Sequence, residues 1–219
     1  MKKPLVSPNF SCLRAILTAL SRIVLLSCAF VSLHSSATAQ ATVNFAYTAN
    51  FESSNISAFA VDSSSGALTP INGSPFPTGL SPHCVTADPK GRFLYSADFY
   101  GHTVSAFRID PTTGALTQVT GSPFATGSYP RWVTVDATSQ VLYAANDGGN
   151  SISAFSIDQA TGALTQLDSS PYPSGDGAAT GPQQIVLHPS GKFAYATNRA
   201  ASSLTGYAVN PDGSLSQLP

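Results

Sequence analysis

The stretch of sequence that decides the fold is TVSAFRIDPTTGALTQVTGSPF, at residues 103–124. Close copies of it stand at 55–76 and 151–172, and a more degenerate copy covers 203–219. One tyrosine precedes each copy at an equivalent position, namely Tyr47, Tyr95, Tyr143 and Tyr195, with spacings of 48, 48 and 52 residues. Self-similarity at a period of this length is typical of repeat proteins, in which each repeat is one supersecondary unit.

Each repeat predicts four β-strands. In the second repeat we expect them at 83–88, 93–98, 103–110 and 115–120, separated by turns rich in Gly and Pro. No window shows the sustained period of a helix. Four strands in about 48 residues match one blade of a β-propeller. A β-sandwich is the alternative, but it has no reason to repeat its sequence. We therefore predict an all-β propeller of four-stranded blades, with repeats starting near residues 45, 94, 142 and 194.

The first 39 residues have the layout of a secretory signal peptide. Four basic residues precede an apolar run at 23–33, and Ala37-Thr38-Ala39 forms a small-x-small cleavage site before Gln40. We predict a signal peptide at 1–39 and a partial propeller at 40–219, exported to the periplasm or the cell exterior. An uncleaved anchor and lipid attachment at Cys28 are alternatives. The apolar run is short for a membrane span, and the residues after Cys28 are apolar.

Removal of the signal peptide changes the charge and the cysteine content. Six basic residues remain against eleven acidic ones, a formal net charge of −5. An acidic chain without Lys/Arg clusters is a poor match for nucleic acid. Cys84 is the one cysteine that remains, which excludes an intrachain disulfide, and no His/Cys cluster has zinc spacing. We expect no nucleic-acid partner, no membrane span, and no metal or other cofactor.

About 3.7 repeats follow the signal peptide, whereas propellers have about 4 to 8 blades. Residues 42–46 resemble the lead-in to a second strand more than a strand that closes a ring. We therefore expect an open sector of a larger propeller. Its uncovered blade faces and strand edges should favour self-association.

Functional side chains are expected where one repeat departs from the others. Two rows do so. The first row follows the proline that opens the first strand: His83, Arg131 and Gln183. The second row follows the Asn or Asp that ends the second strand: Phe51, Phe99, Asp147 and Arg199. Because the two strands are antiparallel neighbours, both rows lie at one end of the blades, around the mouth of the central channel.

The polar members of these rows suit an anionic substrate. Arg131 and Arg199 can bind a carboxylate or phosphate in bidentate fashion, and His83 can transfer protons near neutral pH. The alternative is that these residues merely line a water-filled channel.

Other residues have structural interpretations. One Asn or Asp ends the second strand of every repeat and is expected to bond the following loop backbone: Asn50, Asp98, Asn146 and Asn198. We expect Cys84 to pack between blades, His102 to be solvated in a loop, and His188 to belong to a turn. The loop at 174–180 is longer than its counterpart in the second repeat, which favours a place on the binding face.

Phe93-Leu94-Tyr95 through Asp98, together with the Ser-Ala-Phe and Gly-Ala-Leu-Thr motifs, resembles the lactonase family of seven-bladed β-propellers. That family includes 6-phosphogluconolactonase-like proteins and fungal carboxymuconate lactonising enzymes, and the resemblance covers residues 42–219. It implies an ordered His, Arg, Glu, Arg site. The His matches His83 and the two arginines match Arg131 and Arg199. The Glu position falls on Asp147, which is shorter by one methylene.

The resemblance implies a lactone hydrolase or isomerase that works without metal. Its substrate would be a small lactone or sugar-derived anion. Arg131 and Arg199 would bind the substrate, and His83 and Asp147 would be catalytic, with Asp147 orienting His83 or a water. A non-catalytic exported propeller that binds a protein or glycan is the second hypothesis. A pure scaffold, however, has no need for a histidine and two arginines at one mouth.

Overall fold

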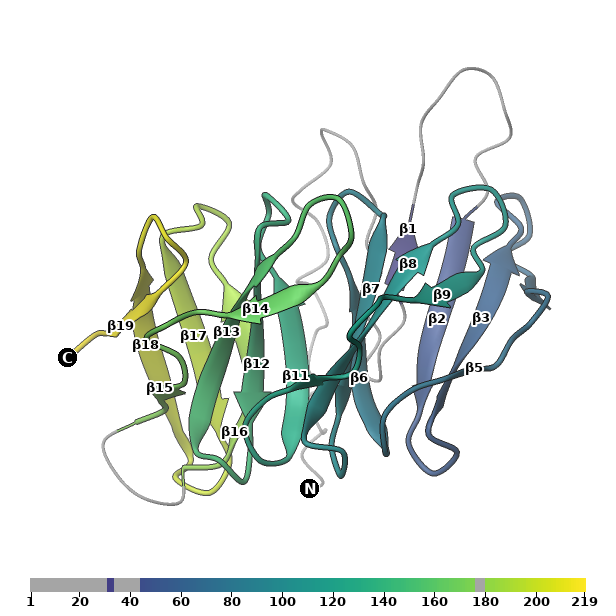
Figure 1. The fold of residues 1–219 in the computed structure, drawn as a ribbon. Coiled ribbons are helices and arrows are strands. Elements are labelled where there is room, and N and C mark those ends of the chain that lie inside the picture. Colours follow the sequence, from purple (N-terminus) through teal and green to yellow (C-terminus); the bar gives the residue numbers. More distant parts are fainter. Residues whose placement is uncertain (1–30, 34–43, 176–179) are drawn as a thin grey trace, which may run out of the picture.

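The computed structural model describes residues 31–33, 44–175 and 180–219. Every regular element within these ranges is a β-strand, and the strands form four sheets, which we call blades 1 to 4 in chain order (Figure 1). This confirms the predicted all-β propeller of four-stranded blades. Among the described residues there is no helix with the length and apolar character that a membrane crossing requires.

The strand bounds follow the repeat. Blade 1 holds β1 (Val31–Leu33), β2 (Asn44–Asn50), β3 (Asn55–Val61), β4 (Leu68–Pro70) and β5 (Phe76–Pro77). Blade 2 holds β6 (Pro82–Ala87), β7 (Phe93–Asp98), β8 (Thr103–Ile109), β9 (Leu116–Gln118) and β10 (Phe124–Ala125). Blade 3 holds β11 (Pro130–Val135), β12 (Val141–Asn146), β13 (Ser151–Ile157), β14 (Leu164–Gln166) and β15 (Tyr172–Pro173). Blade 4 holds β16 (Pro182–Leu187), β17 (Phe193–Asn198), β18 (Ser203–Val209) and β19 (Leu215–Gln217).

The outer strand differs from the single strand that the sequence predicts. In blade 2 it consists of two short pieces, β9 and β10, which both pair with β8. Between them the Ser122 hydroxyl accepts a hydrogen bond from the Ala106 amide at 2.9 Å. A side-chain oxygen therefore replaces a backbone acceptor, and the ladder is interrupted there. Ser74 and Ser170 make the same bond in blades 1 and 3.

The blades stand side by side in chain order, with blades 1 and 4 at opposite ends of the row (Figure 1). Strands β1, β6, β11 and β16 each form one edge of their sheet, and neighbouring blades contact one another through them, so they are the innermost strands. Residues 44–46 belong to β2, as predicted, and form no closing strand. Strand β1 falls within the predicted signal peptide, so cleavage after Ala39 would remove it from blade 1.

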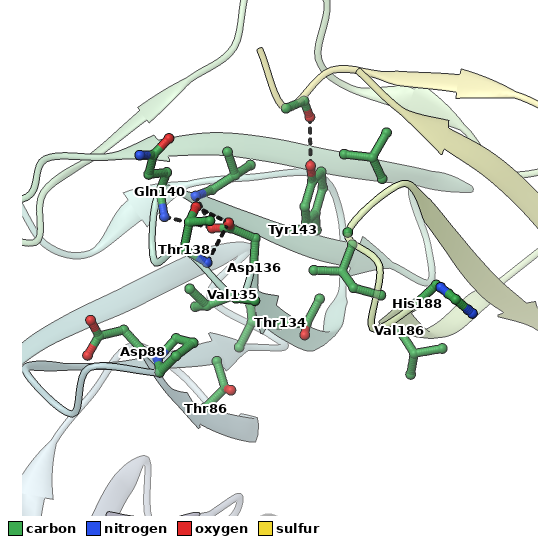
Figure 2. Close-up of a pocket in the computed structure, with 18 of the residues that line it drawn as sticks. Thr86, Asp88, Thr134, Val135, Asp136, Thr138, Gln140, Tyr143, Val186 and His188 are labelled. Carbon is green, nitrogen blue, oxygen red and sulfur yellow. Dashed lines mark hydrogen bonds between the residues drawn. The ribbon is translucent and has the colours of Figure 1, made fainter. Parts of the chain in front are cut away.

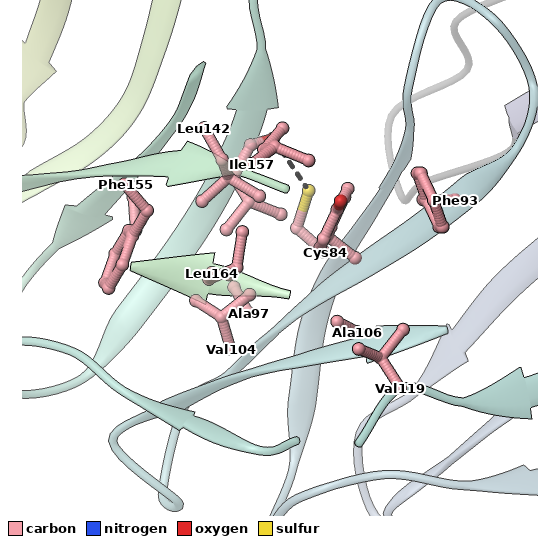
Figure 3. Close-up of a cluster of buried hydrophobic side chains, with 13 residues drawn as sticks. Cys84, Phe93, Ala97, Val104, Ala106, Val119, Leu142, Phe155, Ile157 and Leu164 are labelled. Atoms are coloured by element: carbon pink, nitrogen blue, oxygen red, sulfur yellow. Dashed lines mark hydrogen bonds between the residues drawn. The ribbon is translucent and has the colours of Figure 1, made fainter. Parts of the chain in front are cut away.

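The core is divided among the three blade–blade contacts. One cluster of buried apolar side chains lies between blades 1 and 2, a second between blades 2 and 3, and a third between blades 3 and 4. Cys84 is buried in the second cluster, as predicted (Figure 3). Both faces of an inner blade are therefore apolar, which explains why strands such as β8 carry apolar residues on both sides.

The repeated tyrosine and the repeated glycine join neighbouring blades. The hydroxyl of Tyr47 donates to the carbonyl of Gly114 in the next blade at 2.7 Å. Tyr95 donates in the same way to Gly162 at 3.1 Å, and Tyr143 to Gly213 at 2.8 Å. The repeated tyrosine and the repeated glycine, which are the most regular features of the sequence, are thus donor and acceptor of one hydrogen bond between neighbouring blades.

Candidate functional site

A β-bulge sets each residue of the first row apart from its strand. Pro82 pairs with Asp98, but the next register pair is Cys84 with Ala97, so His83 is left unpaired. The same shift occurs in blade 3 at Arg131 and in blade 4 at Gln183. Bulges re-aim side chains and are common beside active sites. The proline and the bulge therefore turn this row toward the ends of β7, β12 and β17.

The structure brings all four predicted site residues into one chain of contacts across blades 2, 3 and 4. Nη1 of Arg131 lies 3.1 Å from Nε2 of His83. On its other side, Nε of Arg131 donates to Oδ2 of Asp147 at 2.7 Å. Nη2 of Arg199 lies 3.4 Å from the same oxygen. The order of contacts is therefore His83, Arg131, Asp147, Arg199.

The contact with Arg131 fixes the state of His83. A guanidinium carries donors and no acceptor, so Nε2 of His83 must be the unprotonated, accepting nitrogen. Partial exclusion of water lowers the pKa of His83 below its usual value, and the positive charge of Arg131 lowers it further. His83 is therefore neutral at neutral pH and carries a lone pair on Nε2, the form required of a general base.

Among the hydrogen bonds of the described residues, those of Arg131 connect Asp147 to His83. Its side chain is 10% exposed, and its carboxylate lies 2.7 Å from the place that a Cβ on Gly181 would take, so a side chain on Gly181 would collide with it. Gly181 also has a φ of +58°, so both backbone and space favour glycine at this position. Asp147 thus holds the Arg131 guanidinium in place. Arg199, at 59% exposed, is the freer of the two arginines.

An aromatic group that was not predicted as functional from the sequence lies against this site. Phe51, Phe99, Tyr100 and Tyr129, which we call the aromatic cluster, have neighbouring ring centroids 5.0–6.1 Å apart. Phe99 packs against both His83, at 5.9 Å between ring centroids, and the Arg131 guanidinium, at 5.0 Å from its ring. Comparison of the repeats carries the signal, because Tyr100 and Tyr129 depart from the other repeats as clearly as the polar residues do.

The residues interpreted as structural are tied into the fold. The Asn/Asp row bonds mainly side chains of the third strand, not the backbone of the following loop that we expected: Asn146 Nδ2, for example, donates to Ser151 and Ser153. His188 bonds Ser190 within its turn, as predicted. His102 is not simply solvated, because its Nδ1 accepts from the Tyr129 amide at 3.0 Å. In the loop at 174–180, residues 176–179 lie outside the described part of the chain.

A cavity of about 930 Å³ lies at the opposite end of the inner strands (Figure 2). The turns after β6, β11 and β16 line it. The two carboxylates in its lining bond the backbone of those turns: Asp88 accepts from the Phe93 amide, and Asp136 accepts from the Val141 amide. We therefore place the candidate site at the His83 end. Within the described ranges, no group of three or more His, Cys, Asp or Glu side chains could hold a metal ion.

The fold and these contacts define a β-propeller with a histidine, two arginines and a carboxylate at one end of its inner strands. The family described as "Lactonase, 7-bladed beta-propeller" matches residues 75–218, and the chain belongs to this family. No curated protein matches the chain.

Several solved structures share the fold at low sequence identity. A candidate 6-phosphogluconolactonase from Bacteroides fragilis is 24% identical, with a TM-score of 0.68, over 81% of this chain and 53% of that one. A second candidate 6-phosphogluconolactonase, from Bacteroides uniformis, is 21% identical, with a TM-score of 0.68, over 79% of this chain and 50% of that one. The periplasmic gluconolactonase of Pseudomonas aeruginosa is 20% identical, with a TM-score of 0.67, over 81% and 53%. The chain thus spans about half the length of these structures.

Proposed function

We propose that the protein hydrolyses a lactone that carries an anionic group, with the His83–Arg131–Asp147–Arg199 site as its active centre. One observation carries the proposal: Nε2 of His83 lies 3.1 Å from a guanidinium nitrogen of Arg131, a group that can only donate, so this histidine nitrogen is the accepting one. A proton acceptor and a fixed positive charge therefore stand side by side, as hydrolysis of an ester bond requires. Membership of the lactonase family supports this choice.

Each residue then has a role in the reaction. Arg199, the more exposed arginine, binds the carboxylate or phosphate of the substrate. Arg131, held by Asp147, turns its Nη1 to the lactone carbonyl, which frees Nε2 of His83. A water oxygen attacks the carbonyl carbon and its proton passes to Nε2, while Arg131 stabilises the oxyanion. Collapse of this tetrahedral intermediate breaks the C–O bond of the lactone ring, and His83 returns the proton to the leaving alkoxide. The product is a hydroxy acid.

Replacement of His83 tests the proposal. In the full chain, His83→Ala should lower lactone hydrolysis by about 10²-fold, the usual contribution of a general base. The matched control is His188→Ala, a histidine in the turn after β16 of blade 4, at the other end of the inner strands, which should leave activity unchanged. Because the pKa of His83 is lowered, activity should persist at mildly acid pH and fall only below that pKa. Full activity in His83→Ala would contradict the proposal, and an inactive parent would favour a non-catalytic binding protein.

The proposal includes export. It is supported by the layout of residues 1–39 and by the periplasmic location named for the Pseudomonas aeruginosa neighbour. N-terminal sequencing of the exported protein should begin at Gln40, and lipid on Cys28 would contradict this.

A further inference from the structure

The aromatic cluster is confined to the blades that carry His83 and Arg131, together with Phe51 of blade 1. At the position of Tyr100 the other repeats have Glu52, Gly148 and Ala200. At the position of Tyr129 they have Ser81 and Gly181. The blades therefore form without aromatic rings at these positions. Tyr100 is 56% exposed and Tyr129 is 39% exposed, so the two rings offer apolar surface to solvent instead of filling the core.

Tyr129 has a backbone conformation that opposes its side chain. Its φ is +55°, a left-handed value that bulky residues seldom adopt. The His102 imidazole holds the Tyr129 amide at 3.0 Å and also packs against its ring, with centroids 4.7 Å apart. Across the loop, Gly148 leaves room for the ring, because a Cβ there would lie 2.2 Å from Tyr129 Cδ2. The equivalent residues Ser81 and Gly181 take the same left-handed φ, +56° and +58°, so the fold requires this backbone conformation, and a bulky ring is kept here in spite of it.

The cluster is continuous with the polar site. Phe51 and Phe99 both pack against the His83 ring, at 6.0 and 5.9 Å between centroids. The Arg131 guanidinium lies over Phe99. From there the rings of Tyr100 and Tyr129 extend the apolar surface, each 5.0 Å from Phe99 between centroids. A ligand whose anionic group binds the arginines would therefore place its adjoining part on these rings.

We propose that the aromatic cluster is a subsite for an aromatic or similarly apolar ring substituent of the substrate, next to its anionic group. This inference rests on the proposed function. The rings are tilted to one another by 35–86°, so they form an apolar wall and no flat platform for a sugar face. The hydroxyls of a polyol would lose water against this wall with few partners in return. An aryl group would gain edge and offset contacts with the tilted rings.

A pair of lactones that differ by one ring tests the subsite. Both paraconate, a γ-butyrolactone with a carboxylate, and phenylparaconate carry the same reacting group and charge. The full chain should hydrolyse phenylparaconate with a kcat/KM about tenfold higher or more. Tyr100→Ala should abolish most of this preference, bringing the kcat/KM of phenylparaconate close to that of paraconate, whereas Tyr100→Phe, which keeps the ring, should retain it. Because Tyr100 is exposed, both variants should keep the parent's Tm.

Binding of unreactive ligands separates this inference from the proposed function. Phenylsuccinate should bind about tenfold more tightly than succinate in calorimetry, and Tyr100→Ala should remove the difference. If neither lactone is hydrolysed but this binding difference holds, the proposed function fails and the subsite stands. Equal binding of the two dicarboxylates, or a preference that Tyr100→Ala does not change, would overturn the inference. A Tyr100→Ala variant that alters self-association in place of ligand preference would also overturn it, because the cluster would then be a protein interface.

Discussion

The candidate site consists of residues that differ between the repeats, and the β-bulge explains why their side chains lie close together. His83 and Arg131 could be predicted from sequence because each follows a proline at a position where the repeats differ. Their order of contact could not be predicted. It depends on the bulge, which brings Arg131 between His83 and Asp147. Tyr100 and Tyr129 were not predicted because an aromatic ring, unlike a charged group, is expected in the core, although both vary among the repeats just as clearly.

Asp98 also differs from its equivalents in the other repeats, which are asparagines, and its buried charge lowers the free energy of unfolding at neutral pH. It is the acidic member of the Asn/Asp row and is fully buried, with hydroxyl donors from Ser96, Thr103 and Ser105. Burial raises its pKa, although these hydrogen bonds oppose the rise. A carboxyl whose pKa is raised by folding stabilises the fold in acid, and this contribution is lost as the pH rises through the folded-state pKa. At neutral pH the buried charge therefore costs stability.

Asp98→Asn should consequently stabilise the protein at neutral pH. Asn146 shows that an amide fits the equivalent place beside two hydroxyls. We expect a Tm higher by about 2–4 °C at pH 7, the shift that about 1 kcal/mol gives in a domain of this size. The gain should shrink as the pH falls toward the usual range of an aspartate. Thermal unfolding at pH 7 and pH 4 measures both, with Asn146→Asp as the reverse control. A gain that grows in acid would show that the assignment of the buried charge is wrong.

Strands and turns are predicted well where backbone pairing alone decides them. The expected strand at 93–98 coincides with β7, and the one at 103–110 ends one residue beyond β8. The outer strand was predicted less well, because the Ser122 hydroxyl interrupts its ladder. The role of the Gly-Ala-Leu-Thr motif was also not predictable within one repeat. Its glycine takes a positive φ in its own turn and packs against the preceding blade.

Substitution of two glycines of this motif can separate the contribution of the left-handed backbone to stability from the contribution of packing. Gly162 has a φ of +82°, and a Cβ there would lie 2.4 Å from the Phe93 ring of the preceding blade. Gly66 has a φ of +73° with no atom within 4 Å of that position. Gly66→Ala should therefore lower the free energy of unfolding by about 1 kcal/mol, for the left-handed backbone alone.

Gly162→Ala should lower the free energy of unfolding by about 2–4 kcal/mol, because overpacking adds about 1–3 kcal/mol to the backbone cost. Urea unfolding of the two variants gives the comparison. If both lose the same free energy of unfolding, the packing of this glycine against the previous blade contributes nothing.

At the scale of the whole molecule, each blade is completed by the next one. The side chains that blades 1 to 3 turn toward the following blade are buried, as with Tyr95 and Val104 in blade 2. Their equivalents in blade 4 are exposed: Tyr195 is 39% exposed and Leu204 is 70% exposed. The period in the sequence predicts that equivalent positions take equivalent places. It does not show which of them are covered, because coverage depends on the neighbouring blade and not on the repeat itself.

The uncovered face of blade 4 should make the 219-residue chain self-associate. Val186, Phe193, Tyr195 and Leu204 expose apolar surface on one sheet, and monomeric proteins seldom leave such a patch open. Light scattering should therefore give a mass above that of the monomer, rising with concentration. Leu204→Lys should reduce the association because it places a charge in the patch. Leu80→Lys, at a residue 61% exposed in the loop before β6, is the control and should leave the association unchanged. A chain that stays monomeric at every concentration and unfolds cooperatively would contradict the prediction and show that blade 4 is stable with this face in water.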